Sequence, residues 1–338
     1  MCAPRSERTR AGASLSTDWQ PMIAVLGATG YMGRAFVDAL TQKRWDYTGV
    51  SRSKTDYTDF QTLVRFLRDS KPEFVINAAG FTGKPNVDAC EIARAETLKG
   101  NVTLPLTIAH ACALTGTQWG HISSGCSYNG AKVFRNGHWQ IESDLTRPDF
   151  RTLRREHPEN IRGFTEEDEM NFSFRRPPCS FYSGTKALAE EELGKVGGCY
   201  IWRLRLPFDE HDGLRNYLSK LQRYPRIYDN TNSISHRGDF VQACLELWNR
   251  RAPAGVYNMT NPGHVTTREV VEMIQETLGA KRKFDFWSGD DEFYRKGATT
   301  LRSNCILEVD KLLATGVKLR PVREALDDAL RKWRPEAM

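Results

Sequence analysis

Short apolar runs alternate with stretches of helical periodicity over the first half of the chain. The run at residues 22–26 has the β-branched and apolar composition of a buried parallel strand, and three further strands are predicted at residues 47–50, 74–77 and 119–123. After the first run, apolar residues recur at the spacing of one helical face: Met32, Ala35, Phe36, Ala39 and Leu40. Strands that alternate with helices in this way predict an α/β fold with a parallel sheet.

A glycine-rich turn joins the first strand to the first helix. Gly27, Gly30 and Gly33 have the spacing G-x-x-G-x-x-G, not the G-x-G-x-x-G of the usual dinucleotide fingerprint. Glycine is needed where the turn is tight and where backbone N–H groups approach a pyrophosphate at a helix N-terminus. The sequence therefore predicts a Rossmann-type doubly wound sheet that binds a dinucleotide through a set of turn residues: Gly27, Thr29, Gly30, Tyr31, Met32 and Gly33.

The ends of the next two strands indicate which dinucleotide is bound. The second strand leads to Arg52, with no carboxylate for a ribose 2′-hydroxyl, and arginine can hold the 2′-phosphate of NADP. We therefore expect NADPH rather than NADH as the cofactor. Small residues after the third strand, Ala78, Ala79 and Gly80, would let the chain pass close to the cofactor. Asp56 is a candidate acceptor for the adenine amine, and a solvated loop acid is the alternative.

The alternation of strand and helix breaks down after residue 205, where charged and aromatic residues dominate. We expect a smaller C-terminal substrate-binding lobe there, beside the cofactor domain. The predicted division is a disordered tail at 1–19, an NADP-binding Rossmann domain at 20–205 plus 236–260, and a substrate-binding lobe at 206–235 plus 261–338.

Composition and charge exclude several classes of protein. The 48 basic and 42 acidic residues give a net charge of +6, but they are interleaved and form no stripe for nucleic acid. No apolar run approaches the roughly 20 residues that span a bilayer, and the start of the chain has no signal-peptide core. The 8 cysteines are scattered without a C-x-x-C pair, so we expect no metal site and no disulfide framework, and a cytoplasmic location.

Three residues further along the chain fit hydride-transfer chemistry. The fourth strand delivers Ser124 to the carboxyl edge of the sheet, and Tyr182 and Lys186 share one face of a later helix. An ammonium and an oxidised nicotinamide would bring the tyrosine pKa towards the working range, so that Tyr182 could protonate a ketone oxygen as hydride reaches the carbon. On the same helix, we expect the acidic run at residues 190–192 to be exposed.

At this point the chain resembles the extended short-chain dehydrogenase/reductases. More narrowly, it is similar to the dTDP-4-dehydrorhamnose reductases and the bifunctional nucleotide-rhamnose synthases, which are 3,5-epimerase/4-reductases. The resemblance rests on residues 77–88, 124–126, 163–168, 181–186, 258–263 and 302–304. It implies that Ser124, Tyr182 and Lys186 are the reductase triad, with Ser124 where the bifunctional relatives have threonine.

The same resemblance implies an acid/base pair for epimerisation. Cys126 matches a cysteine two residues after the triad hydroxyl, and Lys220 matches a lysine on a later helix if one residue is deleted from the preceding loop. His211 is a substitute for Lys220, and an inert buried thiol is the alternative for Cys126. Sugar-nucleotide 4,6-dehydratases carry acids where this chain has Gly125 and Cys126, so we do not expect dehydratase activity.

The expected substrate is a nucleoside-diphosphate sugar. The substrate-binding candidates lie after the third strand, at the fourth strand and near the C-terminus: Thr82, Lys84, Asn86, Ser124, Arg302 and Asn304. By similarity, Arg302 would neutralise the diphosphate. An insertion at 131–162 is longer than the matching loop of the relatives, and a lid, a specificity element and a surface loop all remain open for it.

These observations predict an NADPH-dependent 3,5-epimerase and 4-keto reductase of a nucleoside-diphosphate 4-keto-6-deoxyhexose. One alternative is an enzyme with only one of these activities, and another is a non-catalytic NADP-binding subunit. The oligomeric state stays open, with a homodimer as one outcome. Neither nucleic acid nor a membrane is an expected partner.

Overall fold

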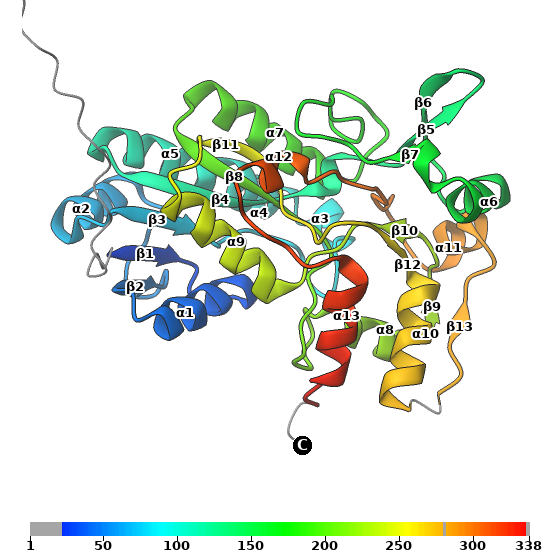
Figure 1. Cartoon of the computed structure of the whole chain (residues 1–338). Helices are drawn as coiled ribbons and strands as arrows, with labels where there is room; N and C mark the ends of the chain where they lie inside the picture. Colours follow the sequence, from blue (N-terminus) through cyan, green and yellow to red (C-terminus); the bar gives the residue numbers. More distant parts are fainter. Residues whose placement is uncertain (1–21, 280–281, 336–338) are drawn as a thin grey trace, which may run out of the picture.

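A six-stranded parallel sheet forms the centre of the molecule (Figure 1). The computed structural model describes residues 22–279 and 282–335, so the tail predicted at 1–19 lies outside the described residues. The sheet has the order β11-β8-β4-β3-β1-β2. Its strands are β1 (Ile23–Leu26), β2 (Tyr47–Val50), β3 (Phe74–Asn77), β4 (Gln118–Ser124), β8 (Cys199–Leu204) and β11 (Gly255–Asn258). The strand order reverses between β1 and β3, where doubly wound sheets bind their ligands.

Helices cover both faces of this sheet, which confirms the doubly wound Rossmann-type fold. On one face Phe36 of α1 (Tyr31–Lys43) and Phe240 of α9 (Arg237–Asn249) pack on Trp202. On the other face, one apolar core joins α2 (Phe60–Ser70), α5 (Leu104–Thr115) and α7 (Phe181–Val196). Within the described ranges, no helix combines the length and apolar character needed to cross a bilayer.

The C-terminal part of the chain has an apolar core of its own. Leu218 of α8 (Tyr217–Arg223), Ile274 of α10 (Thr267–Leu278) and Leu326 of α13 (Val322–Arg331) belong to it. The remaining elements of this region are β9 (Arg226–Ile227), β10 (Thr231–Asn232), β12 (Val265–Thr266), β13 (Asp285–Phe286), α11 (Asp290–Lys296) and α12 (Asp310–Ala314). This core lies where a substrate-binding lobe is expected, while the domain boundaries drawn from the sequence stay a prediction.

The insertion at 131–162 is a small folded unit. It forms a three-stranded antiparallel sheet and two helical segments, namely β5 (Ala131–Arg135), β6 (His138–Glu142), β7 (Ile161–Arg162), α6 (Pro148–Glu156) and η3 (Pro158–Asn160). Phe150 packs with Ile306, and Arg154 donates two hydrogen bonds to Glu269 on α10, at 2.8 and 3.2 Å. The segment is therefore docked on the C-terminal region, not a loose loop.

The acidic run on α7 differs from its prediction. Glu190 is only 4% exposed. Its carboxylate accepts hydrogen bonds from Ser123 at 2.5 Å and from Arg203 of β8 at 2.9 Å. Arg203 is itself buried and stacks on Tyr128. The prediction of an exposed run was thus wrong. Glu191 and Glu192 are half-buried, and Glu190 is buried because a cation on the neighbouring strand stabilises its carboxylate.

Removing Glu190 should strongly destabilise the fold. In Glu190→Ala the Arg203 guanidinium would stay buried without its counter-charge, so we expect the free energy of unfolding to fall by about 3 kcal/mol. Urea denaturation measures this change. Glu192→Ala is the matched control, because Glu192 pairs with the exposed Lys195 and should cost at most about 1 kcal/mol. Equal losses in the two variants would contradict a stabilising role for the buried pair.

Candidate active site

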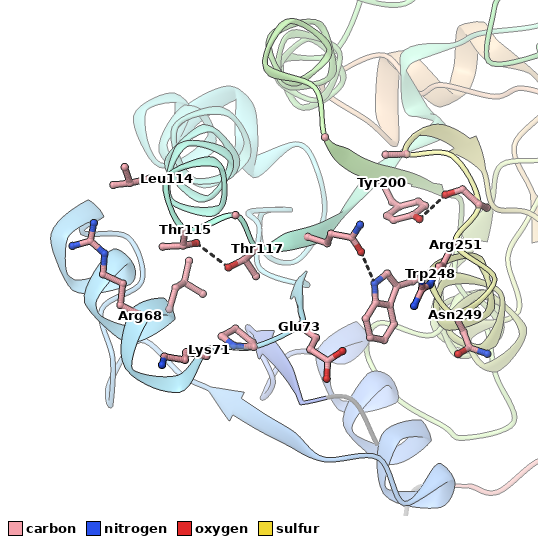
Figure 2. A pocket seen from close by; sticks show the side chains of 17 residues that line it. Arg68, Lys71, Glu73, Leu114, Thr115, Thr117, Tyr200, Trp248, Asn249 and Arg251 are labelled. Atoms are coloured by element: carbon pink, nitrogen blue, oxygen red, sulfur yellow. Dashed lines mark hydrogen bonds between the residues drawn. The ribbon is translucent and has the colours of Figure 1, made fainter. Parts of the chain in front are cut away.

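One pocket lies at the amino edge of the sheet, away from the predicted site. It has a volume of about 820 Å³ and is bordered by the ends of α2, α5 and α9 (Figure 2). Arg68, Lys71 and Arg251 line it, and cations are favoured at helix C-termini, where the dipole is negative. Ligands of doubly wound sheets bind at the opposite, carboxyl edge. We therefore interpret this pocket as a structural junction.

At the carboxyl edge, the turns after β1 and β3 lie in close contact. Gly27 has a φ of +76°, and a Cβ there would lie 2.9 Å from the backbone nitrogen of Ala79. A Cβ on Gly33 would lie 2.1 Å from the carbonyl oxygen of Gly27, so Gly33 lets α1 pack on the turn. Met32 is buried in the core, so only its backbone can face a ligand.

The N-terminus of α1 fits an anionic group. Its N-cap residue, Gly30, has no side chain to satisfy the first N–H groups, and the first turn contains no acidic residue. Thr29 and Gly30 are exposed. Free N–H groups and the positive end of the helix dipole would thus face the diphosphate of a dinucleotide. These residues fit the predicted cofactor, although the individual contacts stay predictions.

The other predicted cofactor residues surround this turn. Ala78 and Ala79 are half-buried, and Gly80 is exposed beside the site. Arg52 is exposed in the turn after β2, where a 2′-phosphate would lie. The Asp56 carboxylate accepts two hydrogen bonds from Thr58, at 2.6 and 3.1 Å, so it stabilises its own loop and its adenine role remains a prediction.

The predicted triad comes together at the carboxyl end of β4. Ser124 ends this strand, and Tyr182 lies in the first turn of α7, one turn before Lys186. Burial raises the pKa of Tyr182 above its usual value, and the nearby Cys126 thiol raises it further. A hydrogen bond with Ser124 opposes this rise. In the protein alone, the phenol therefore keeps its proton at neutral pH.

Lys186 lies beneath the tyrosine in the interior. Its ammonium group donates a hydrogen bond to the carbonyl oxygen of Ile122 at 3.3 Å. Burial lowers the pKa of Lys186, and the nearby Cys126 and Glu190 oppose this change. A Cβ on Gly80 would lie 3.7 Å from the Lys186 nitrogen, so the lysine reaches the edge of the cofactor turn.

Cys126 lies beside the triad. It belongs to the 3-10 turn η2 (Gly125–Ser127), it is 7% exposed, and its backbone N–H donates to the Ser124 hydroxyl at 3.3 Å. Burial raises the pKa of the Cys126 thiol, and hydrogen bonds with Ser124 and Ser183 oppose the rise. The Cys126 thiol therefore keeps its proton at neutral pH, and its role as an acid stays a prediction.

Lys220 projects from α8 in the C-terminal region. Burial lowers the pKa of Lys220, and the nearby Arg215 lowers it further. Arg215 donates hydrogen bonds to the Thr82 hydroxyl at 2.8 Å and to the Gly83 carbonyl at 3.2 Å. The start of α8 therefore meets the loop after β3, while the pairing of Lys220 with Cys126 stays a prediction.

The remaining substrate candidates are placed less directly. Lys84 is exposed, and Asn86 accepts a hydrogen bond from the backbone of Asp88. Arg302 donates two hydrogen bonds to Asp88, at 2.7 and 2.8 Å. To bind a diphosphate as predicted, Arg302 would have to break these bonds or contact Asp88 and the diphosphate together. Asn304 is buried against Asn232.

His211 lies on an exposed loop, with Glu210 3.7 Å away. Nothing in these contacts favours it over Lys220 as the second acid/base residue, so both assignments remain predictions.

Two further residues position the catalytic helix, and the sequence reading did not single them out. Asn101 lies in the π-helical segment η1 (Lys99–Thr103), between α4 (Arg94–Leu98) and α5. Its amide makes two hydrogen bonds to the backbone of Phe81, both at 2.9 Å. Glu91 of α3 (Ala89–Ile92) accepts from the backbone N–H of Phe181 at 2.7 Å. A π-helical bulge often marks a functional site, but no residue pattern in the sequence predicts one.

The fold and the site together define an oxidoreductase of the short-chain dehydrogenase/reductase type that acts on nucleotide sugars. Residues 21–334 match the family described as the RmlD substrate binding domain, and the chain belongs to this family. A bifunctional dTDP-4-dehydrorhamnose 3,5-epimerase/dTDP-4-dehydrorhamnose reductase of Arabidopsis thaliana is 30% identical over 304 residues, which cover 89% of this chain and 90% of the relative.

Solved structures agree on the fold. The L780 UDP-rhamnose synthase of Acanthamoeba polyphaga mimivirus has a TM-score of 0.78 at 20% identity and covers 93% of this chain and 100% of its own. A dTDP-4-dehydrorhamnose reductase of Bacillus anthracis, in complex with NADP, has a TM-score of 0.72 at 17% identity and covers 93% and 99%. The family match and the Arabidopsis relative confirm the family predicted from the motifs, and the predicted NADP cofactor agrees with the second structure.

Proposed function

We propose that this protein is an NADPH-dependent enzyme that first epimerises a nucleoside-diphosphate 4-keto-6-deoxyhexose at C3 and C5 and then reduces its 4-keto group. The product would be a nucleoside-diphosphate 6-deoxyhexose such as a nucleotide-linked rhamnose. The observation that carries the proposal is the Tyr182 phenol, which keeps its proton at neutral pH and interacts with Ser124 at the carboxyl end of β4. Ketone reduction consumes a proton at that position.

In the reduction, Tyr182 gives its proton to the ketone oxygen, and Ser124 donates a hydrogen bond to the same oxygen. When bound, NADPH supplies the hydride. The Lys186 ammonium lies one helical turn from Tyr182 and stabilises the phenolate that remains. Because Lys186 also bonds to the carbonyl of Ile122, its position is fixed by the strand that carries Ser124.

In the epimerisation, a proton leaves a carbon next to the ketone on one face of the ring and another is added on the opposite face. Lys220 has a lowered pKa and acts as the base in its neutral form, taking the proton to become an ammonium. The Cys126 thiol, whose pKa is raised, gives a proton to the other face and becomes a thiolate. Ser124 and Tyr182 stabilise the enolate oxygen between these steps, and exchange with solvent restores both groups.

The direct test is incubation with NADPH and UDP- or dTDP-4-keto-6-deoxyglucose. We expect oxidation of NADPH, measured by its absorbance, and incorporation of deuterium from D₂O at C3 and C5, measured by mass spectrometry. Reduction without exchange would support the single-activity reductase instead. No NADPH oxidation with any nucleotide form of the sugar would favour the non-catalytic NADP-binding subunit.

Arg52 should set the choice of cofactor. A guanidinium–phosphate hydrogen bond contributes more than a neutral one, so in Arg52→Ala we expect the KM for NADPH to rise by about tenfold. The KM for NADH should stay unchanged, because NADH has no 2′-phosphate. Arg68→Ala, at the opposite edge of the sheet, is the control. Equal changes in the KM values for NADPH and NADH would show that Arg52 does not recognise the 2′-phosphate.

A further inference from the structure

Arg205 is a buried cation immediately after β8, and it has no assigned role. It is 5% exposed. Its guanidinium donates hydrogen bonds to the hydroxyl and carbonyl oxygens of Ser303, both at 2.9 Å, and to the side-chain oxygen of Asn232. Its Nε is buried and has no hydrogen-bond partner in the described part of the chain. All of these acceptors are neutral.

Arg203, two residues earlier, is a buried arginine that differs from Arg205 in having a carboxylate partner. Arg203 is equally buried, but Glu190 lies 2.8 Å from its guanidinium and neutralises it. Among the residues that the structure describes, no carboxylate lies within 4.0 Å of Arg205. Burying an unpaired charge costs several kcal/mol, so the retained charge of Arg205 calls for a compensating benefit.

The charge lies directly behind the reactive turn. A Cβ on Gly125 would lie 2.9 Å from Cδ and 3.1 Å from Cγ of Arg205. The arginine stem therefore packs on the residue between Ser124 and Cys126, and only glycine fits there. Arg205 lowers the pKa values of both Cys126 and Tyr182. The other polar and titratable groups that act on Cys126 are Ser124, Ser183 and Lys186, and further groups coupled to it are Cys90, Cys179, Tyr182 and Cys305.

We propose that Arg205 is a positioning residue whose unneutralised charge, held behind the Gly125 turn, stabilises negative charge on the Cys126 sulfur during proton transfer. This inference rests on the proposed epimerisation for its purpose, but the electrostatic effect on the thiol can be measured without substrate. The charge makes a buried thiol, which would otherwise hold its proton too tightly, a better acid.

The sharpest test keeps the Arg205 side chain and neutralises its charge with a neighbouring carboxylate. Ser303→Asp places a carboxylate against the guanidinium, and Ser303→Asn has nearly the same shape without the charge. The rate of Cys126 alkylation by iodoacetamide is followed against pH by peptide mass spectrometry, with the unaltered protein treated in parallel as the reference. Below the midpoint, we expect Cys126 in Ser303→Asp to react about tenfold more slowly than in Ser303→Asn, which corresponds to about one unit of pKa.

A second pair of variants keeps the inference falsifiable if Ser303→Asp does not fold. Arg205→Lys retains the charge and Arg205→Met removes it, and NADPH binding checks that each variant is folded. A raised Cys126 pKa in Arg205→Met, but not in Arg205→Lys, supports the inference. The inference is overturned if Cys126 has the same pKa in Ser303→Asp as in Ser303→Asn, and the same pKa in Arg205→Lys as in Arg205→Met. A purely structural role of Arg205 would not depend on charge.

Solvent deuterium exchange separates this inference from the proposed function. In Ser303→Asp, exchange at C3 and C5 should be about tenfold slower than in Ser303→Asn, in line with the weaker acid. If the unaltered protein reduces the sugar without exchange, the epimerase proposal fails while the thiol titrations still decide the effect of Arg205.

Discussion

Replacing Tyr182 with phenylalanine should lower the rate of ketone reduction by on the order of 10³- to 10⁴-fold. In the proposed mechanism the phenol gives its proton to the ketone oxygen, and burial raises its pKa above the usual value, so that it keeps this proton until the reaction. The change removes one oxygen atom and keeps the ring, so the fold and NADPH binding should be preserved. Stopped-flow measurement of NADPH oxidation, with saturating 4-keto sugar, gives the rate.

Tyr257→Phe is the matched control for this experiment. Tyr257 is buried at β11 and donates its hydroxyl proton to the carbonyl of Pro253 at 2.7 Å, far from the site. Its loss should cost about 1 kcal/mol of stability and leave the reduction rate unchanged. If Tyr182→Phe reduces the sugar as fast as the unaltered protein, another group must protonate the ketone.

Replacing Cys126 with serine should lower solvent deuterium exchange at C3 and C5 by on the order of 10²- to 10⁴-fold. A serine hydroxyl is a far weaker acid than a thiol, while its size and hydrogen bonds to Ser124 and Ser183 can be retained. Reduction of a sugar that is already epimerised should continue, because Tyr182 and Lys186 are untouched. Mass spectrometry of the product in D₂O measures exchange.

Cys244→Ser is a suitable control, because Cys244 is a buried thiol in the core between α9 and the sheet. This variant tests whether loss of any buried thiol affects exchange through stability. Undiminished exchange in Cys126→Ser would show that Cys126 is not an acid/base residue of the epimerisation. The acid and the base would then be other residues, with His211 and Lys220 among the candidates.

The sequence was most informative where the interacting residues are neighbours along the chain. The glycine turn, the strand that ends at Ser124 and the Tyr182–Lys186 spacing are local patterns, and the structure places them together as expected. Local periodicity was wrong about Glu190, because nothing near it in the sequence reveals that Arg203 lies on the adjacent strand.

Interactions between distant segments were not predictable. Arg215 meets Thr82 across 133 positions of sequence, and Arg302 meets Asp88 across 214. Such pairs depend on how the C-terminal region closes on the loop after β3, which no residue pattern encodes. For the same reason no sequence pattern marks Arg205, although its stem packs against the turn that carries Cys126.

The docking of residues 131–162 has a consequence for what removal of this segment would do. Glu269 binds Arg154 and also accepts a hydrogen bond at 2.7 Å from the backbone of Thr266, which completes the capping box of α10. Phe150 covers Ile306 in the same way. The segment and the helix it touches are thus parts of one cooperative folding unit. Excision of residues 131–162 would therefore expose Ile306 and leave Glu269 with Arg323 as its cationic partner, so we expect a loss of stability.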